Sequence, residues 1–168
     1  GGSGGACQKL PISKVAAIGD DGTNHLTNAI DNNLNTRWSN NGRGSWIQAD
    51  LGSKNSICSV DIAWYRGNLR QNSYTISASN DGISFTNVLT GKSTDTTTSF
   101  EKYNMPTGFE ARYVRITVND NTENNWASIT EIALDGSHVK SFMTYSSDTL
   151  VVTRNYDASL PTLMNPEE

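Results

Sequence analysis

Apolar and polar residues alternate over several stretches of this chain, and a period of two residues predicts β-strands. In residues 112–118, for example, Val114, Ile116 and Val118 fall on one face of the expected strand. No stretch has the repeat of about 3.6 residues that indicates an amphipathic helix. We therefore expect an all-β fold, with strands at residues 11–18, 45–51, 57–64, 74–79, 83–89, 100–105, 112–118 and 129–134.

Turn residues separate these stretches about every ten residues, which is typical of an all-β sandwich. Gly52 is expected to end the strand at 45–51, and the run 80–82 (Asn-Asp-Gly) predicts a hairpin. Residues 65–73 break the alternation and form a polar loop, and loops of this kind often carry function.

One short stretch, residues 28–38, is rich in oxygen-bearing side chains and suggests a cation-binding loop. A hard cation such as calcium binds six to eight oxygens, which here include the Asp31 carboxylate, the Thr36 hydroxyl and backbone carbonyls. The expected second carboxylate is Glu131, which can approach only if the two ends of the domain are adjacent. The alternative is that Asp31 and its asparagine neighbours are ordinary turn residues.

Composition narrows the choice of partner. The 168 residues suit one domain, and a formal charge of −4 with a pI near 5.1 argues against a nucleic-acid partner. No apolar run approaches the roughly 18 residues of a membrane helix, and no charged-then-apolar leader opens the chain. Residues 1–5 (Gly-Gly-Ser-Gly-Gly) are expected to be a flexible linker or tag remnant.

The chain has two cysteines, Cys7 and Cys58. A disulfide between them would imply an oxidising compartment, and we expect a secreted or cell-surface protein. Two buried free thiols are the alternative.

Five stretches in order resemble the coagulation factor 5/8 type C domains, also called discoidin domains, and among them the family 32 carbohydrate-binding modules. The stretches are residues 29–38, 46–52, 74–82, 112–116 and 126–132. The resemblance implies an eight-stranded antiparallel jelly-roll β-sandwich of the galactose-binding-domain-like type over residues 6–136. Residues 137–168 are then an extension. With strands at 141–145 and 149–155 it is a β-hairpin of a following module or an added edge pair, and otherwise it is a linker to another module.

The resemblance also implies a structural calcium ion. Carried over residue by residue, its ligands are Asn28, Asp31, Asn33, Thr36, Thr130 and Glu131. Relatives have glycine after the loop aspartate, whereas this chain has Asn32. The loop tolerates this difference because asparagine also accepts a left-handed backbone. Arg37 is expected to brace this loop.

By the same resemblance, ligands bind at loops near the calcium end of the sandwich. Aromatic faces beside planar polar side chains suit a sugar, and arginines suit an anionic sugar such as a uronate. The candidate ligand-binding residues are Asn40, Asn41, Arg43, Tyr65, Arg66, Arg70, Asn124, Asn125 and Trp126.

No nucleophile with an adjacent base and orienting group can be assembled from the sequence, so we expect no catalysis. The leading hypothesis is a non-catalytic carbohydrate-binding module with a structural calcium, part of a larger multidomain protein. The alternative is a cell-surface adhesion domain that binds protein or glycoprotein. Membrane binding ranks third, since the loops are polar rather than tipped with apolar residues.

Overall fold

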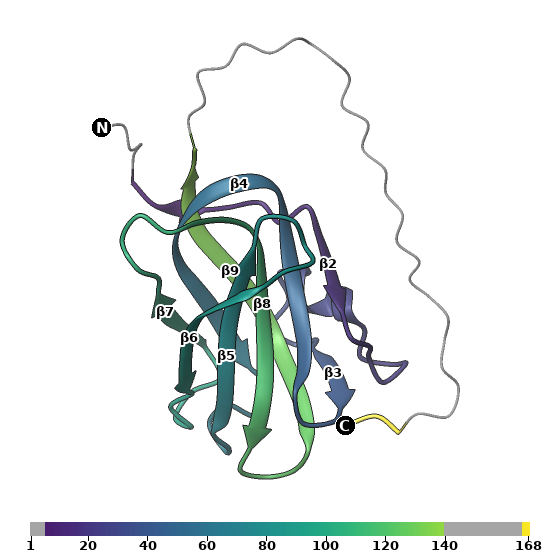
Figure 1. Ribbon diagram of the computed structural model, residues 1–168. Coiled ribbons are helices and arrows are strands. Elements are labelled where there is room, and N and C mark those ends of the chain that lie inside the picture. The colour runs from purple at the N-terminus through teal and green to yellow at the C-terminus, as the bar shows by residue number, and fades with distance from the viewer. Residues whose placement is uncertain (1–5, 140–165) are drawn as a thin grey trace.

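The computed structural model describes residues 6–139 and 166–168. This part of the chain is almost entirely β-structure, arranged as two packed layers (Figure 1). The all-β prediction is confirmed, with nine strands in the described residues against the eight expected. The elements are β1 (Gln8–Lys9), β2 (Lys14–Ala17), the 3-10 helix η1 (Leu26–Ile30), β3 (Trp38–Asn41), β4 (Ser45–Trp64), β5 (Asn72–Ser79), β6 (Thr86–Lys92), β7 (Phe100–Asn104), β8 (Glu110–Asn121) and β9 (Trp126–His138).

The long strand β4 belongs to both layers. Its first part pairs with β2 and β8, and its second part pairs with β9 and β7, all antiparallel. The register shifts between Asp50 and Asn55, and there Gly52 takes a φ of 83°, a conformation that glycine adopts freely. The chain therefore bends without leaving the sheet, and β4 arches over one end of the sandwich (Figure 1). The prediction that Gly52 ends a strand was wrong.

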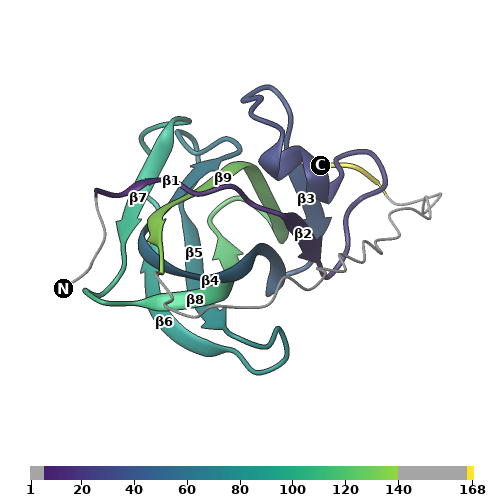
Figure 2. The ribbon, with the colours of Figure 1, turned by 90° about the horizontal axis from the view of Figure 1, so that it is seen from above.

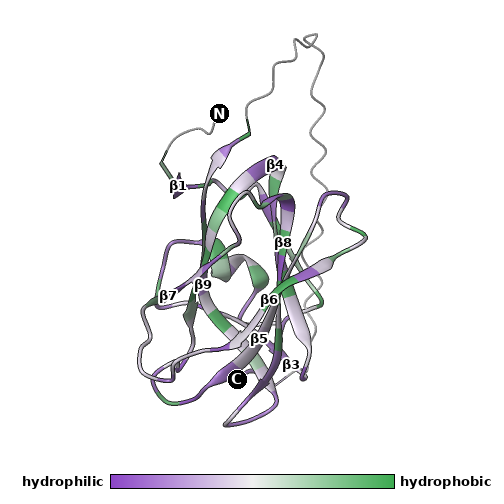
Figure 3. Ribbon diagram, turned by 60° about the vertical axis from the view of Figure 1, so that its left-hand side comes forward, coloured by the Kyte–Doolittle hydropathy of each residue, from purple (hydrophilic) through white to green (hydrophobic). Residues whose placement is uncertain are grey.

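The core lies between the two layers and is built from the inward residues of the alternating strands. Val114, Ile116 and Val118 are all buried, as the period-two pattern predicted. Two tryptophans are also fully buried: the indole N–H of Trp38 donates to the carbonyl oxygen of Gly19, and that of Trp64 donates to the Tyr103 hydroxyl. Hydrophobic and hydrophilic residues follow one another along the strands (Figure 3).

A disulfide joins Cys7 to Cys58 and decides between the two alternatives for the cysteines. It anchors the segment before β1 to β4, while Gln8 of β1 pairs with Gly136 of β9. The chain therefore enters the sandwich beside the C-terminal end of β9, as Figure 2 shows from above.

Local boundaries differ from several expectations. β3 was not predicted, β2 covers only part of residues 11–18, and β6 begins later than residue 83. The hairpin turn after β5 is confirmed, since β5 and β6 pair antiparallel and the Asp81 carboxylate accepts the backbone N–H groups of Ile83 and Ser84. The possible strands at 141–145 and 149–155 lie outside the described residues. Within residues 6–139 and 166–168, no helix is long and apolar enough to cross a membrane.

Candidate functional site

The loop between β4 and β5 places a buried arginine at one end of the sandwich. The Arg70 side chain is fully buried, whereas arginine normally keeps its charged head in water. Its guanidinium lies 5.5 Å from the ring centroid of Tyr65, the first residue after β4. Arg37, immediately before β3, covers the same ring at 4.0 Å. Two cations thus converge on one aromatic ring, an arrangement that is attractive because the ring face is electronegative.

The Arg70 guanidinium holds the carboxylate of Glu168. Nη1 donates to Oε1 at 2.9 Å and Nη2 donates to Oε2 at 3.1 Å, a bidentate pair. Asn124 Nδ2 also donates to Oε1 at 2.9 Å, and the Ser128 hydroxyl donates to Oε2. Burial raises the pKa of Glu168, but hydrogen bonds from Arg70 and Ser128 outweigh it and hold that pKa below its usual value. The carboxylate is therefore ionised and enclosed by donors.

The main chain of Glu168 is held as well. Arg37 Nη2 donates to its carbonyl oxygen at 2.7 Å, and its N–H donates to Asp21 Oδ2 at 3.3 Å. Two views place these C-terminal residues beside β3 (Figures 1 and 2). We call this set, Arg37, Tyr65, Arg70, Asn124 and Ser128, the carboxylate site.

The turn between β8 and β9 fixes the orientation of Asn124. Its Oδ1 accepts hydrogen bonds from Asn121 Nδ2 and from the backbone N–H of Trp126. Only its amide nitrogen is then left to face the Glu168 carboxylate. Asn121, itself buried, also accepts the backbone N–H groups of Glu123 and Asn124, so the turn is held from inside.

Glu123 links two arginines behind the site. Arg66 donates to its carboxylate twice, at 2.9 and 2.7 Å, and Arg70 donates once at 3.1 Å. The hydrogen bond from Arg66 is the main cause that lowers the pKa of Glu123. Counting the three arginines (37, 66 and 70) against Asp21 and Glu123 leaves one positive charge. The site therefore suits one additional anionic group, the place that Glu168 takes.

The structure brings together four of the nine predicted ligand-binding residues, namely Tyr65, Arg66, Arg70 and Asn124. The other five lie around it without hydrogen-bonding to Glu168. Arg43 pairs with Asp120 at 3.1 Å, and Asn40 Nδ2 donates to Ser45 Oγ. The remaining three, Asn41, Asn125 and Trp126, lie on or beside the β3–β9 pair, where Asn41 is opposite Trp126 and the Asn125 carbonyl accepts the Gly42 N–H.

Arg37, Ser128 and Asp21 were not among the predicted ligand-binding residues. The Arg37 side chain lies on Tyr65 and donates to Ser39 Oγ at 3.2 Å. Its contact with the cation loop is made by the main chain, where its carbonyl oxygen accepts Asn28 Nδ2 at 2.9 Å. A signal for Arg37 was present, because it precedes the buried Trp38 and so faces away from the core. Ser128 gave no signal, since it stands between the apolar Ala127 and Ile129 in a buried part of β9.

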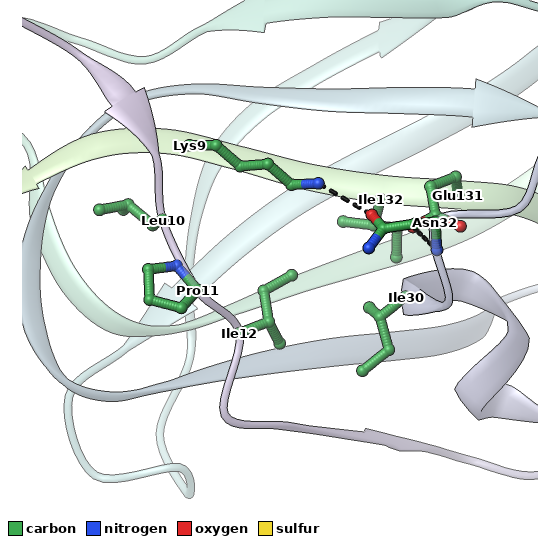
Figure 4. Close-up of a pocket in the computed structure, with 8 residues that line it drawn as sticks. All are labelled: Lys9, Leu10, Pro11, Ile12, Ile30, Asn32, Glu131 and Ile132. Carbon is green, nitrogen blue, oxygen red and sulfur yellow. Dashed lines mark hydrogen bonds between the residues drawn. The ribbon is translucent and has the colours of Figure 1, made fainter.

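The cation loop has two carboxylates at its centre. Asp31 Oδ1 accepts the Asn33 N–H at 3.0 Å, and Oδ2 accepts the Thr36 hydroxyl at 2.5 Å. The Glu131 carboxylate, from β9, is buried beside Asp31, and its Oε2 accepts the Asn32 N–H at 3.0 Å. Figure 4 shows this last bond at the edge of an open pocket of about 390 Å³.

A charged Glu131 is unfavourable in this loop, and the nearby charge of Lys9 offsets this only in part. Burial raises the pKa of Glu131 to about 7; the Asn32 N–H opposes that rise and the charge of Asp31 adds to it. Glu131 Oε1 is buried with no hydrogen-bond partner in the described part of the chain. Asn32 has a φ of 60°, the left-handed backbone expected there.

The six predicted metal ligands lie on two segments that meet at this loop. Asn28, Asp31, Asn33 and Thr36 lie between the start of η1 and the start of β3, and Thr130 and Glu131 are consecutive in β9. Within residues 6–139 and 166–168, no three His, Cys, Asp or Glu side chains cluster as for a metal ion. Two carboxylates with carbonyl and hydroxyl oxygens still suit calcium, which accepts such ligands. The unpartnered buried Glu131 Oε1 fits that role.

Comparison with known proteins gives one family. The F5/8 type C domain model matches residues 13–132. No curated protein sequence matches the chain.

Solved structures of the same fold include three carbohydrate-binding examples. The family 32 carbohydrate-binding module (CBM32) of AlyQ, in complex with 4,5-unsaturated mannuronic acid, is 42% identical with a TM-score of 0.73 over 76% of this chain and 97% of that one. Truncated AlyQ with CBM32 and alginate lyase domains is 40% identical with a TM-score of 0.75 over 83% of this chain, which spans 36% of that protein. A pectin-binding carbohydrate-binding module is 27% identical with a TM-score of 0.70, over 74% of this chain and 91% of that one.

Proposed function

Since the chain belongs to the F5/8 type C domain family, we propose that it is a non-catalytic carbohydrate-binding module that recognises a uronic-acid residue through its carboxylate site. One observation carries the proposal: the bidentate pairing of the buried Arg70 with a carboxylate, at 2.9 and 3.1 Å. Planar guanidinium matches planar carboxylate, and enclosure from water strengthens the pair.

The remaining groups of the site match the rest of a sugar. Arg37 donates to an oxygen and Asp21 accepts from an N–H at the main chain of Glu168. A sugar hydroxyl both donates and accepts, so one or two hydroxyls next to the carboxyl group could satisfy both residues. Among the similar structures, the CBM32 of AlyQ was solved with an unsaturated mannuronic acid, which is also a uronic acid.

Calcium at the cation loop is the second part of the proposal. Asp31 and Glu131 would bind it with oxygens from Asn28, Asn33, Thr36 and Thr130. Its charge would relieve the repulsion between the two carboxylates and satisfy Glu131 Oε1. The ion would tie the η1–β3 segment to β9, the strand that also carries Ser128 of the carboxylate site.

A module of this kind works by keeping a larger protein on its polysaccharide. We therefore propose that the chain is one part of a secreted or cell-surface multidomain protein. The Cys7–Cys58 disulfide supports an oxidising compartment.

Calorimetric titration with oligouronates tests the glycan assignment. Each oligomer is compared with its carboxyl-reduced derivative, which keeps the hydroxyls and removes the charge. We expect binding of at least one oligouronate and at least about 10-fold weaker binding of its reduced form, because a charge-assisted hydrogen bond contributes roughly 1.5–3 kcal/mol.

Two variants make the titration specific to the site. Arg70→Gln should abolish measurable binding, and Arg37→Gln should weaken it. Arg43→Gln is the matched control, because Arg43 is exposed and pairs with Asp120 outside the site. Equal binding of the acidic and reduced oligomers would contradict the proposal, as would an Arg70→Gln variant that folds and binds like the wild type.

A further inference from the structure

The carboxylate site is filled by the chain itself. Residues 166–168 lie at this site. Pro166 and Glu167 are exposed, whereas the Glu168 side chain is only 8% exposed. Glu168 alone makes the contacts: two hydrogen bonds from Arg70 and one each from Asn124, Ser128 and Arg37, while its own N–H reaches Asp21.

These contacts are those a bound carboxylate would make. All the donors that face the Glu168 carboxylate belong to the carboxylate site, and Arg70 has one guanidinium fork to offer. The three arginines and two acids around it leave a single positive charge, which one carboxylate neutralises. A second carboxylate that entered the site would find the Arg70 guanidinium already paired with Glu168. It would also find no net positive charge to attract it.

We propose that Glu168 is an internal competitor of the glycan: its carboxylate and a uronate carboxylate bind the carboxylate site in turn, never together. This inference rests on the proposed function, since it concerns the regulation of the same site. Glu168 thereby sets the affinity of the module, because a glycan binds only the fraction of molecules whose site is open.

The size of the effect follows from the covalent connection. A partner on the same chain acts at an effective concentration on the order of millimolar, so even a weak contact keeps the site partly filled. When the open fraction is about a tenth to a third, the apparent Kd rises about 3- to 10-fold above its intrinsic value.

The test compares the wild-type chain with variants that differ from it at one glutamate. Glu168→Gln removes the competing charge, and Glu167→Gln removes the same charge one residue earlier, where the side chain is exposed. Calorimetric titration with the oligouronate that binds best should give about 3- to 10-fold tighter binding for Glu168→Gln. Glu167→Gln should bind like the wild type.

A second measurement follows the competitor directly. The amide signal of Glu168 in a ¹H–¹⁵N spectrum should move on saturation with the oligouronate. It should move toward its position in the Arg70→Gln variant, in which the contact is lost. In the Asp21→Asn variant the same signal should shift without glycan, because the Glu168 N–H donates to Asp21.

The outcomes separate the two proposals. If wild type, Glu167→Gln and Glu168→Gln all bind the oligouronate with the same Kd, or if the Glu168 amide stays in place on saturation, internal competition is wrong and uronate binding stands. If no variant binds any oligouronate, Glu168→Gln included, both proposals are wrong. The shift of the Glu168 amide in Arg70→Gln then reports the docking contact alone.

Discussion

The Arg37 guanidinium lies 4.0 Å from the ring centroid of Tyr65, and the ring therefore acts as a platform for the cations of the carboxylate site. We expect Tyr65→Ala to weaken oligouronate binding about 10-fold, because each cation–π contact contributes roughly 0.5–2 kcal/mol and both arginines lose their support. Tyr65→Phe keeps the ring and should bind within about twofold of the wild type. Titration calorimetry measures both, and unchanged affinity in a folded Tyr65→Ala protein would show that the ring is not a platform.

We expect Glu131→Gln to change the melting temperature in opposite directions in calcium and in chelator. In calcium, Glu131→Gln should lower the melting temperature, because a ligand of the ion is lost. In chelator it should melt at or above the wild type, because a buried amide beside Asp31 costs less than a buried carboxylate. Differential scanning calorimetry gives both values.

The control for this comparison is Asp135→Asn, on the same strand. Asp135 pairs with the exposed Lys102, so its substitution should leave the calcium response intact. Wild-type melting that is equal in calcium and in chelator would rule out the cation assignment.

The buried Tyr74 and the half-buried Tyr103 predict loss of stability at alkaline pH. Burial raises the pKa of Tyr74 to about 12, with the charge of Glu101 adding to it, and burial also raises that of Tyr103. In the unfolded chain the tyrosine pKa is about 10. The stability that Tyr74 contributes in its protonated form is therefore fully present below pH 10 and is lost as the pH rises from about 10 to about 12. For Tyr74 it amounts to about 3 kcal/mol.

Ultraviolet absorbance of tyrosinate and circular dichroism, followed together, check this expectation. Tyr74 and Tyr103 should ionise only as the β-signal disappears. Tyr103→Phe removes one of the two groups and should make the alkaline transition less steep. Full ionisation of all six tyrosines while the fold persists would contradict the raised pKa values.

Loss of the disulfide should destabilise the domain without changing its ligand. The bond joins residues 51 apart, and the chain-entropy model gives about 4 kcal/mol for a loop of that size. Replacing Cys7 and Cys58 by serine should lower the melting temperature by roughly 10 °C. Oligouronate affinity at low temperature should be unchanged, since the bond lies at the other end of β9 from the carboxylate site. A drop in affinity in the folded variant would argue that the two ends are coupled.

The sequence predicts the inner faces of the strands well, because a half-buried strand repeats every two residues. The buried Val114, Ile116 and Val118 are the clearest case. It does not predict that β4 is continuous. Gly52 reads locally as a turn, and only its place between two layers, with Asn55 again paired to Ala111, makes it a bend inside one strand.

Some residues of the candidate site could be predicted from the sequence and others could not. Arg70 and Asn124 are polar residues in polar loops, and so they could be selected from the sequence. The placement of Ser128 beside Arg37 depends on how β3 pairs with β9, where Ser39 is opposite Ser128. That register is a tertiary contact between residues 89 apart, and no local pattern records it.

The pairing of Gln8 with Gly136 determines how the module faces its surroundings. Ser128 lies eight residues earlier on β9, so the carboxylate site is about 25 Å from the point where the chain enters. A resin or a neighbouring enzyme attached ahead of Cys7 is therefore joined at the end of β9 opposite the carboxylate site. Attachment at this end therefore requires no redesign of the loops that carry the carboxylate site.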